Sequence, residues 1–134
     1  MRAVIQRVSK ASVEIENKIN GQIQIGLLIL LGIEDSDTQQ DIDWLSRKII
    51  QMRIFSDADG KMNLSLQEVN GNILLISQFT LFASTKKGNR PGFTRSAKPE
   101  FAIPLYEQFI KTLEIQLDKK IQTGIFGADM KVEL

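Results

Sequence analysis

The sequence predicts an α+β fold, in which a mostly antiparallel, barrel-like β-sheet core carries two packed helices. Three observations predict it. Apolar and polar residues alternate through residues 12–25, helical periodicity occupies residues 37–52 and 99–119, and apolar runs at 26–33 and 71–83 are typical of strands buried on both faces. A length of 134 residues fits one domain, so we expect a single unit over residues 1–134.

Residues 12–25 are expected to form a β-hairpin. Their apolar side chains alternate with Ser, Glu and Gln, and these apolar positions are Val13, Ile15, Ile23 and Ile25. Asn20-Gly21 lies between the two arms. Because both residue types tolerate positive φ, this pair predicts the tight turn.

The first helix is expected to begin at Asp37. Asp37 and Gln40, three residues later, resemble a capping box that fixes the start of a helix. The residues that follow at helical spacing form an apolar stripe of Ile42, Leu45, Ile49 and Met52.

Asp57-Ala58-Asp59-Gly60 predicts a turn after this helix. The acidic spacing also suggests a calcium loop, but such a loop needs glycine at its sixth position, where this chain has Met62. We therefore expect no metal site here.

The second helix is expected to begin near Pro99 and to run towards Lys119. Its buried stripe would be Ala102, Leu105, Phe109, Leu113 and Leu117. Pro104 leaves two possibilities: the helix starts late, with Pro104 in its first turn, or it kinks at Pro104. Residues 125–134, after a bend at Gly124, are expected to form a last strand.

Composition excludes several classes of protein. Hydrophobic residues make up 43% and charged residues 25% of the chain, which is typical of a globular protein. The longest apolar run, residues 27–31, is far shorter than the roughly 20 residues that cross a bilayer. The first residues lack an apolar stretch long enough for a secretory signal, so we expect a cytoplasmic location.

The absence of histidine and cysteine limits the chemistry further. A Ser-His-Asp or Cys-His arrangement cannot be built, and no glycine-rich loop has Walker or Rossmann spacing. The remaining possibility is a site of oriented hydrogen-bond donors, including backbone N–H groups, which stabilises an oxyanion while water attacks.

Positive charge gathers in one short segment, which contains Lys86, Lys87, Arg90, Arg95 and Lys98, with only Glu100 of opposite sign. This segment fits a phosphate-bearing partner. A solvated basic loop explains it equally well, so composition alone leaves both interpretations open.

Several motifs together resemble the D-aminoacyl-tRNA deacylases. They run in order from end to end: Met1–Val8, Ser77-Gln78-Phe79-Thr80-Leu81, Lys87-Gly88-Asn89-Arg90-Pro91, Leu105-Tyr106 and Thr123–Met130. The resemblance implies a cytoplasmic, homodimeric hydrolase that needs no metal or cofactor. Its substrate would be D-aminoacyl-tRNA, and glycine mischarged on tRNA, cleaved at the ester to the terminal ribose.

The resemblance also implies roles for single residues. Ser77, Gln78, Phe79 and Thr80 would form the catalytic pocket for the terminal adenosine. In that pocket Thr80 would position the substrate, while the neighbouring ribose hydroxyl and main-chain donors near Phe79 assist water. Ala102 would lie close to the aminoacyl group. Phe126 would border the adenine, Gly127 would allow close backbone approach, and Met130 would wall the pocket. Lys86, Lys87 and Arg90 would contact tRNA phosphates.

Each of these residues also has an ordinary structural explanation. For Phe79, core packing explains the residue at least as well as a site role. Ser77 and Thr80 could form hydrogen bonds within the sheet. Without the resemblance, Phe126 and Met130 would be interpreted as core residues.

In this family, an Asn-x-Gly-Pro motif follows Asp-Met-x-Val-x-Leu, enters the neighbouring subunit's pocket and excludes L-amino acids by steric clash. The sequence stops at Leu134, before that motif. Either L-amino acids are not rejected in this way, or the sequence is part of a longer protein. We favour the second explanation, because a last strand that ended there would leave a sheet neighbour unpaired.

Two other function classes stay open. One is a non-catalytic, editing-like module that binds an RNA end, and the other is an assembly domain that pairs through exposed strand edges.

Overall fold

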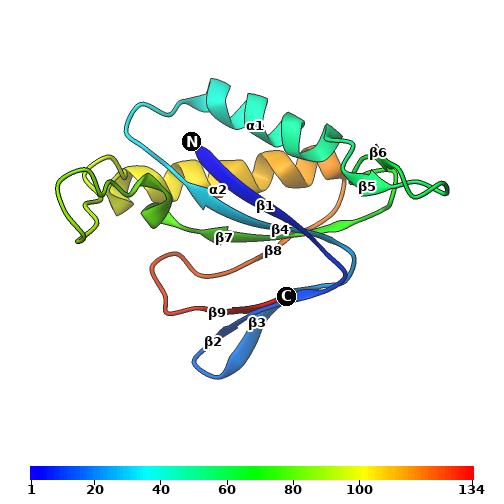
Figure 1. The fold of residues 1–134 in the computed structure, drawn as a ribbon, viewed down its shortest axis with the longest axis horizontal. Coiled ribbons are helices and arrows are strands. Elements are labelled where there is room, and N and C mark those ends of the chain that lie inside the picture. Colours follow the sequence, from blue (N-terminus) through cyan, green and yellow to red (C-terminus); the bar gives the residue numbers. More distant parts are fainter.

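The computed structural model describes all 134 residues, arranged in three layers. Helices α1 and α2 cover one face of a four-stranded sheet, and a small three-stranded sheet lies against its other face (Figure 1). In chain order the elements are β1 (Arg2–Val8), β2 (Ala11–Ile15), β3 (Lys18–Ile23), β4 (Gly26–Gly32), α1 (Gln39–Gln51), β5 (Phe55–Ser56), β6 (Met62–Leu64), β7 (Asn72–Ser77), the 3-10 helix η1 (Phe79–Phe82), α2 (Pro99–Leu117), β8 (Gln122–Thr123) and β9 (Lys131–Glu133).

The predicted α+β class is confirmed, but the sheets do not close into a barrel. The larger sheet has the order β1-β4-β7-β8, the smaller one β3-β2-β9, and β5 and β6 form a separate pair. Most pairings are antiparallel, whereas β4 with β7 and β7 with β8 are parallel. A parallel pair needs a crossover, and α1 lies on the connection from β4 to β7.

Strands β4 and β7 are buried on both faces, as their apolar runs predict. Leu27, Ile29 and Leu31 of β4 face the helices and join a cluster of 18 buried residues. Leu28 belongs to a second cluster of 7 buried residues, between the two sheets. No helix of the structure is long and apolar enough to span a membrane.

Gly26 fixes where the parallel pairing of β4 and β7 begins. It lies opposite Asn72, and a Cβ atom at Gly26 would be 2.6 Å from the backbone nitrogen of Asn72. No side chain fits in that space, so only glycine allows the two backbones to approach so closely.

The hairpin of β2 and β3 is confirmed, but the prediction of its turn at Asn20-Gly21 is wrong. The turn lies at Glu16 and Asn17, which have φ of 52° and 60°. Gly21 sits within β3, opposite Val13. The Asn20 side chain instead donates to the carbonyl of Thr123, 2.8 Å away. The Asn-Gly turn rule considers only neighbouring residues, so it cannot predict this long-range contact.

The predicted start of α1 is wrong by two residues. The helix begins at Gln39, and the capping pair is Thr38 and Asp41 rather than Asp37 and Gln40. Asp37 is buried, where it pairs with the amino group of Met1 and accepts the N–H of Glu34 at 2.8 Å. A buried carboxylate needs such partners. Because Asp37 is engaged in these tertiary contacts, it does not cap the helix.

The residue 57–60 turn is confirmed, between β5 and β6. Asp57 accepts the N–H groups of Asp59 and Lys61 at 2.9 and 3.0 Å, and these bonds lower the pKa of its carboxyl. No group of three or more Asp and Glu residues is placed to hold a metal ion.

The strand predicted over residues 71–83 ends at Ser77, and residues 79–82 form the 3-10 helix η1. The N–H of Gln78 still bonds to the carbonyl of Leu31 at 2.7 Å, but β4 ends at Gly32 and offers no further partners. The prediction for residues 125–134 is also too long, because only Lys131–Glu133 pairs, with β2.

The prediction of α2 is confirmed within two residues of its end. It begins at Pro99, so the late start is wrong, and Pro104 lies exposed inside the helix. Leu105 of the predicted stripe is only half-buried, and Tyr106 occupies a buried position instead.

Candidate active site

A cleft opens at the carboxyl end of β7. It has a volume of about 250 Å³ and is lined by Ile76–Phe79 from one segment and by Phe126–Ala128, Met130 and Val132 from another. In Figure 1 the loop that connects β8 to β9 passes below the end of β7 and η1. Segments about fifty positions apart in the sequence therefore form the two walls of this cleft.

The structure places seven of the predicted site residues together. Ser77, Gln78, Phe79, Phe126, Gly127 and Met130 line the cleft. Ala102, from the first turns of α2, borders a narrow extension of it with Ser77, Gln78, Phe79 and Phe126. The lining contains no charged side chain, so any polar assistance within the cleft comes from Ser77, Gln78 and the backbone.

Phe79 is not a core residue. Its side chain is 54% exposed and packs edge-on against Phe93, with ring centres 5.4 Å apart. It is the first residue of η1, and a 3-10 helix leaves its first N–H groups without partners in the helix. None of the backbone hydrogen bonds in the turns and loops has the N–H group of Phe79 or Thr80 as its donor. They remain available to an oxyanion.

Thr80 does not line the cleft directly. Its hydroxyl oxygen accepts a hydrogen bond from the side-chain amide of Gln78. An amide is not a base, so Gln78 cannot remove the proton that a nucleophilic threonine must lose. The hydrogen bond ties Thr80 to the side chain of Gln78, which lines the cleft.

Tyr106, for which no site role was predicted, supports a residue that lines the cleft. Tyr106 of α2 contacts Phe126 edge-on, with ring centres 5.9 Å apart, and donates its hydroxyl to the carbonyl of Leu75 at 3.0 Å. Burial raises the pKa of Tyr106 far above its usual range, so the phenol stays neutral. The Leu105-Tyr106 pair was its only signal in the sequence.

Gly127 has a φ of 78°, in the left-handed region that glycine tolerates. No atom lies within 4 Å of the position that a Cβ would take there. The backbone at this point of the cleft is therefore open to a ligand. Ala97, Ala128 and Val132 also line the cleft or its extension, although no site role was predicted for them. Ala128 and Val132 lie within the motifs that carry the family resemblance, whereas nothing in the sequence pattern signalled Ala97.

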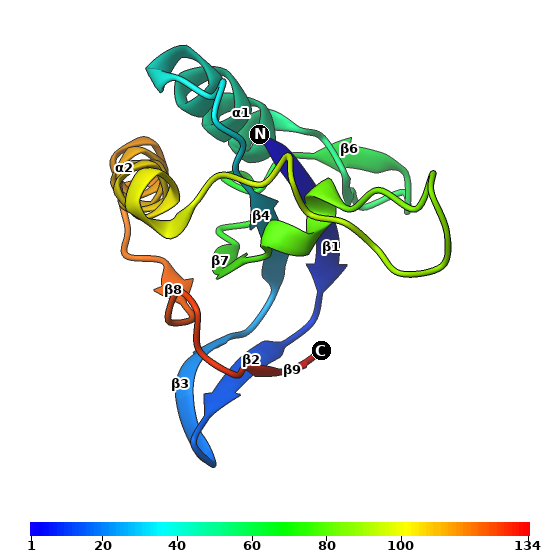
Figure 2. The same cartoon turned by 90° about the vertical axis from the view of Figure 1, so that its left-hand side faces the viewer.

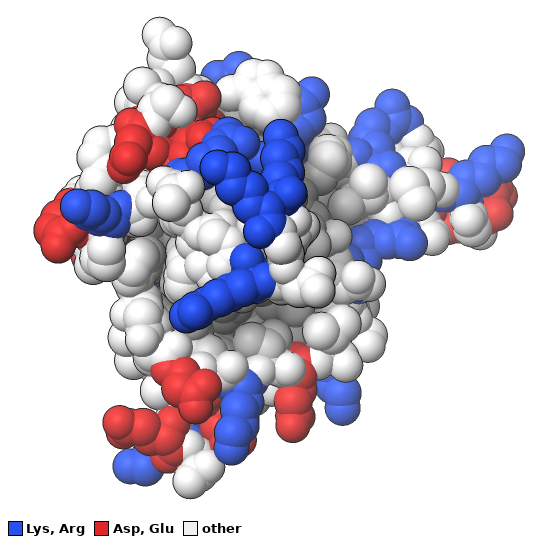
Figure 3. Space-filling view, turned by 60° about the vertical axis from the view of Figure 1, so that its left-hand side comes forward, with Lys and Arg blue, Asp and Glu red and all other residues white.

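The structure does not bring the three predicted tRNA-binding residues into the cleft. Lys86, Lys87 and Arg90 are exposed on a loop closed by paired hydrogen bonds between Ser84 and Gly92, at 2.8 and 2.9 Å. Figure 2 shows this loop extending away from the sheet and helices. In Figure 3, Lys and Arg side chains gather over the centre of one face.

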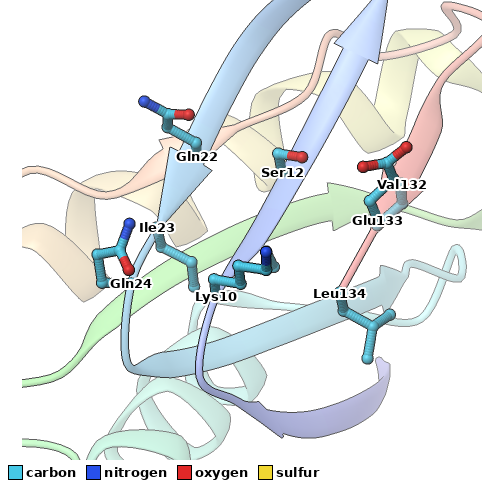
Figure 4. A pocket seen from close by; sticks show the side chains of 9 residues that line it. Lys10, Ser12, Gln22, Ile23, Gln24, Val132, Glu133 and Leu134 are labelled. Carbon is cyan, nitrogen blue, oxygen red and sulfur yellow. The ribbon is translucent and has the colours of Figure 1, made fainter.

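A larger depression of about 710 Å³ lies elsewhere, across the ends of β2, β3 and β9 (Figure 4). Its polar lining comes from Lys10, Ser12, Gln22, Gln24 and Glu133. Of the residues that border the cleft, only Val132 also borders this depression. It contains none of the predicted site residues, so size alone does not locate the candidate site.

Comparisons with known proteins identify the family of the chain. The family model described as D-Tyr-tRNA(Tyr) deacylase matches residues 4–134. The chain is 64% identical to the D-aminoacyl-tRNA deacylase of Flavobacterium johnsoniae and 65% identical to that of Cytophaga hutchinsonii. In both cases the match covers 100% of this chain and 89% of the relative.

Two solved structures are also similar. The c-Myc DNA Unwinding Element Binding Protein superposes with a TM-score of 0.93 at 37% identity, covering 100% of this chain and 91% of the other. A probable eukaryotic D-amino acid tRNA deacylase gives a TM-score of 0.84 at 15% identity, covering 98% and 91% of the two chains, and shows the fold alone. The predictions of family and of an ester hydrolase are confirmed, and the chain belongs to the D-Tyr-tRNA(Tyr) deacylase family.

Proposed function

We propose that the chain hydrolyses the ester of D-aminoacyl-tRNA, and of glycine mischarged on tRNA, in the cleft at the end of β7. The observation that carries this proposal is the convergence of Ser77–Phe79 with Phe126, Gly127 and Met130 around one cavity. The terminal adenosine would lie against Phe126, where the open backbone at Gly127 admits it. The aminoacyl group would point towards Ala102.

The proposed reaction depends mainly on backbone groups rather than on side chains. The N–H groups of Phe79 and Thr80 stabilise the oxyanion that forms when water attacks the ester carbonyl. The free hydroxyl of the terminal ribose assists that water, because the cleft lining offers no carboxylate, imidazole or amine. Gln78, held by Thr80, fixes the position of the substrate. No metal or cofactor takes part.

The remaining parts of the proposal concern partners and location. Residues 1–134 act as one domain in the cytoplasm. Lys86, Lys87 and Arg90 contact phosphates of the tRNA from their exposed loop. The protein acts as a homodimer, and the exposed Val4 and Ile25 are apolar surface that a second copy would cover. Light scattering coupled to gel filtration tests this last point.

The deciding experiment compares D-aminoacyl-tRNA and L-aminoacyl-tRNA carrying the same amino acid. We expect release of the amino acid from the D-form, and loss of that release when bulk is added at the cleft. Binding of both forms without release of either would instead identify an RNA-end-binding module. Tight dimerisation with no salt-dependent RNA affinity would identify an assembly domain.

A further inference from the structure

Two arginines meet at one aromatic ring beside the cleft. The guanidinium carbon of Arg2 lies 4.6 Å from the centre of the Phe82 ring, and that of Arg95 lies 5.5 Å from it. Phe82 is 2% exposed and ends η1, so its ring is fixed. Cation–π attraction holds both guanidinium groups against it. One comes from the first strand and the other from the segment before α2.

The two arginines differ in how their charge is balanced. Arg95 forms a salt bridge with Glu34 at 2.8 Å. Arg2 forms none, and the carboxylate of Asp37 is already paired with the amino group of Met1. Arg2 therefore carries an unbalanced positive charge at an exposed position.

Arg2 is also held in place while most of its donors stay free. One of its nitrogens donates to the carbonyl of Leu81 at 2.8 Å. A guanidinium has five N–H donors in a planar fork, and this is the one side-chain hydrogen bond that Arg2 forms in the structure. A cation that is already ordered loses little entropy when it binds an anion.

The position of this pair relative to the cleft suggests which anion it meets. Phe82 follows Phe79 by one turn of η1, which is about 6 Å along a 3-10 helix. The hydroxyl of Ser96, next to Arg95, donates to the carbonyl of Phe79 at 2.7 Å and ties the two segments together. The nucleotide that carries the ester has its own phosphate on the same ribose, so a phosphate lies within one nucleotide of the cleft.

We propose that Arg2 and Arg95 bind a backbone phosphate at the acceptor end of the tRNA, with Arg2 as the principal ligand. This inference rests on the proposed function and adds a phosphate site to it, separate from the exposed loop of Lys86, Lys87 and Arg90. Arginine suits the task, because its fork matches two phosphate oxygens at once. The phosphate would compete with Glu34 for Arg95.

The test uses the variants Arg2→Met and Arg95→Met with two substrates. Methionine keeps an unbranched apolar stem against Phe82 and removes the charge. For D-aminoacyl-tRNA we expect KM to rise about threefold to tenfold in each variant, while kcat stays within about twofold. The slope of log KM against log salt should fall by about 0.7 per lost phosphate contact. D-aminoacyl-adenosine, which has no phosphate, should be hydrolysed as by the unaltered protein.

Lys61→Met is the matched control. Lys61 is exposed and lies between β5 and β6. In Figure 1 these two strands lie on the opposite side of the molecule from the carboxyl end of β7, so Lys61→Met should leave the hydrolysis of both substrates unchanged. Arg2→Lys keeps the charge and should recover part of the lost affinity. Equal losses with both substrates would mean that Arg2 only supports η1 through Leu81, and would overturn the proposal. An unchanged KM and salt slope for the tRNA would overturn it as well.

The binding of uncharged tRNA to the same variants, measured by fluorescence anisotropy, tests the phosphate site independently of ester hydrolysis. If the unaltered protein hydrolyses neither substrate, the proposed function fails. The phosphate site would still be supported by weaker, less salt-dependent binding in Arg2→Met. It would be rejected by binding identical to that of the unaltered protein.

Discussion

The side-chain amide of Gln78 donates a hydrogen bond to the hydroxyl oxygen of Thr80 at the edge of the cleft. This contact turns the one hydroxyl of η1 towards an amide, which cannot act as a base. The relationship favours a site in which Thr80 positions Gln78 and the backbone stabilises the developing charge.

Thr80→Ala should therefore retain substantial deacylation, with kcat/KM reduced by less than about tenfold, whereas loss of a true nucleophile costs about 10⁴-fold or more. Single-turnover hydrolysis of D-aminoacyl-tRNA measures the difference. Thr80→Val is the matched control, because it keeps the shape and removes the hydroxyl. Complete loss of activity in both variants would restore a hydroxyl-mediated mechanism.

Ala102→Leu should block the reaction. Ala102 is 4% exposed on α2 and borders the extension of the cleft, so added methyl groups would fill the space expected for the aminoacyl group. Overpacking should lower the stability by about 1–3 kcal/mol, which thermal unfolding records separately from activity. Ala102→Ser adds little volume and should keep most of the activity. Full activity in a folded Ala102→Leu protein would place the aminoacyl group elsewhere.

A substrate whose terminal ribose lacks the hydroxyl next to the ester should react poorly. The cleft supplies no side-chain base, so the ribose hydroxyl is the group left to assist water. We expect a loss of about 10²-fold or more in the rate of the chemical step, which is the usual contribution of a positioned proton-transfer group. Normal turnover of the deoxy substrate, measured beside the ribose form, would reject substrate assistance.

The capping interaction between Thr38 and Asp41 at the start of α1 should make the free energy of unfolding depend on pH. The backbone N–H of Thr38 donates to Asp41 at 2.8 Å and lowers the pKa of that carboxyl, with a smaller contribution from the Thr38 hydroxyl. A lowered pKa stabilises the fold above the unfolded value of about 4, and this stability is lost as pH falls through the folded value. Asp41→Ala should cost about 1 kcal/mol at pH 7 in denaturant unfolding.

The cost of Asp41→Ala should shrink as the pH falls below about 4, because the carboxyl is then protonated in the unaltered protein too. Asp35 has an exposed carboxylate that forms no hydrogen bond. Asp35→Ala should therefore change neither the free energy of unfolding at pH 7 nor its dependence on pH. A penalty for Asp41→Ala that is the same at pH 3 and pH 7 would contradict the role of the charged cap.

Tyr106→Phe should lose the hydrogen bond to Leu75, at a cost of about 1 kcal/mol, and keep its deacylation rate because the ring still supports Phe126. Burial raises the folded pKa of Tyr106, so the stability it confers is complete below the unfolded pKa of about 10 and falls as pH rises above it. The difference between the two proteins in denaturant unfolding should therefore narrow only above about pH 10. Tyr106→Leu, which removes the ring, should instead raise KM.

Local sequence patterns determined the elements of this protein. The apolar runs of β4 and β7 and the helical stripes of α1 and α2 predicted their positions, because burial of one or both faces imposes a period on the residues that form them. The motifs around Ser77–Thr80 and Phe126–Met130 identified the family and named most of the cleft residues.

Only the tertiary structure decided how these parts meet. Residue patterns could not show that Asn20 bonds to Thr123, that Asp37 pairs with the amino group of Met1, or that Arg2 and Arg95 share the ring of Phe82. Each of these contacts joins positions far apart in the chain, and each is fixed by the packing of sheets and helices. Periodicity records which face of an element is buried, whereas the partner on that face depends on the fold as a whole.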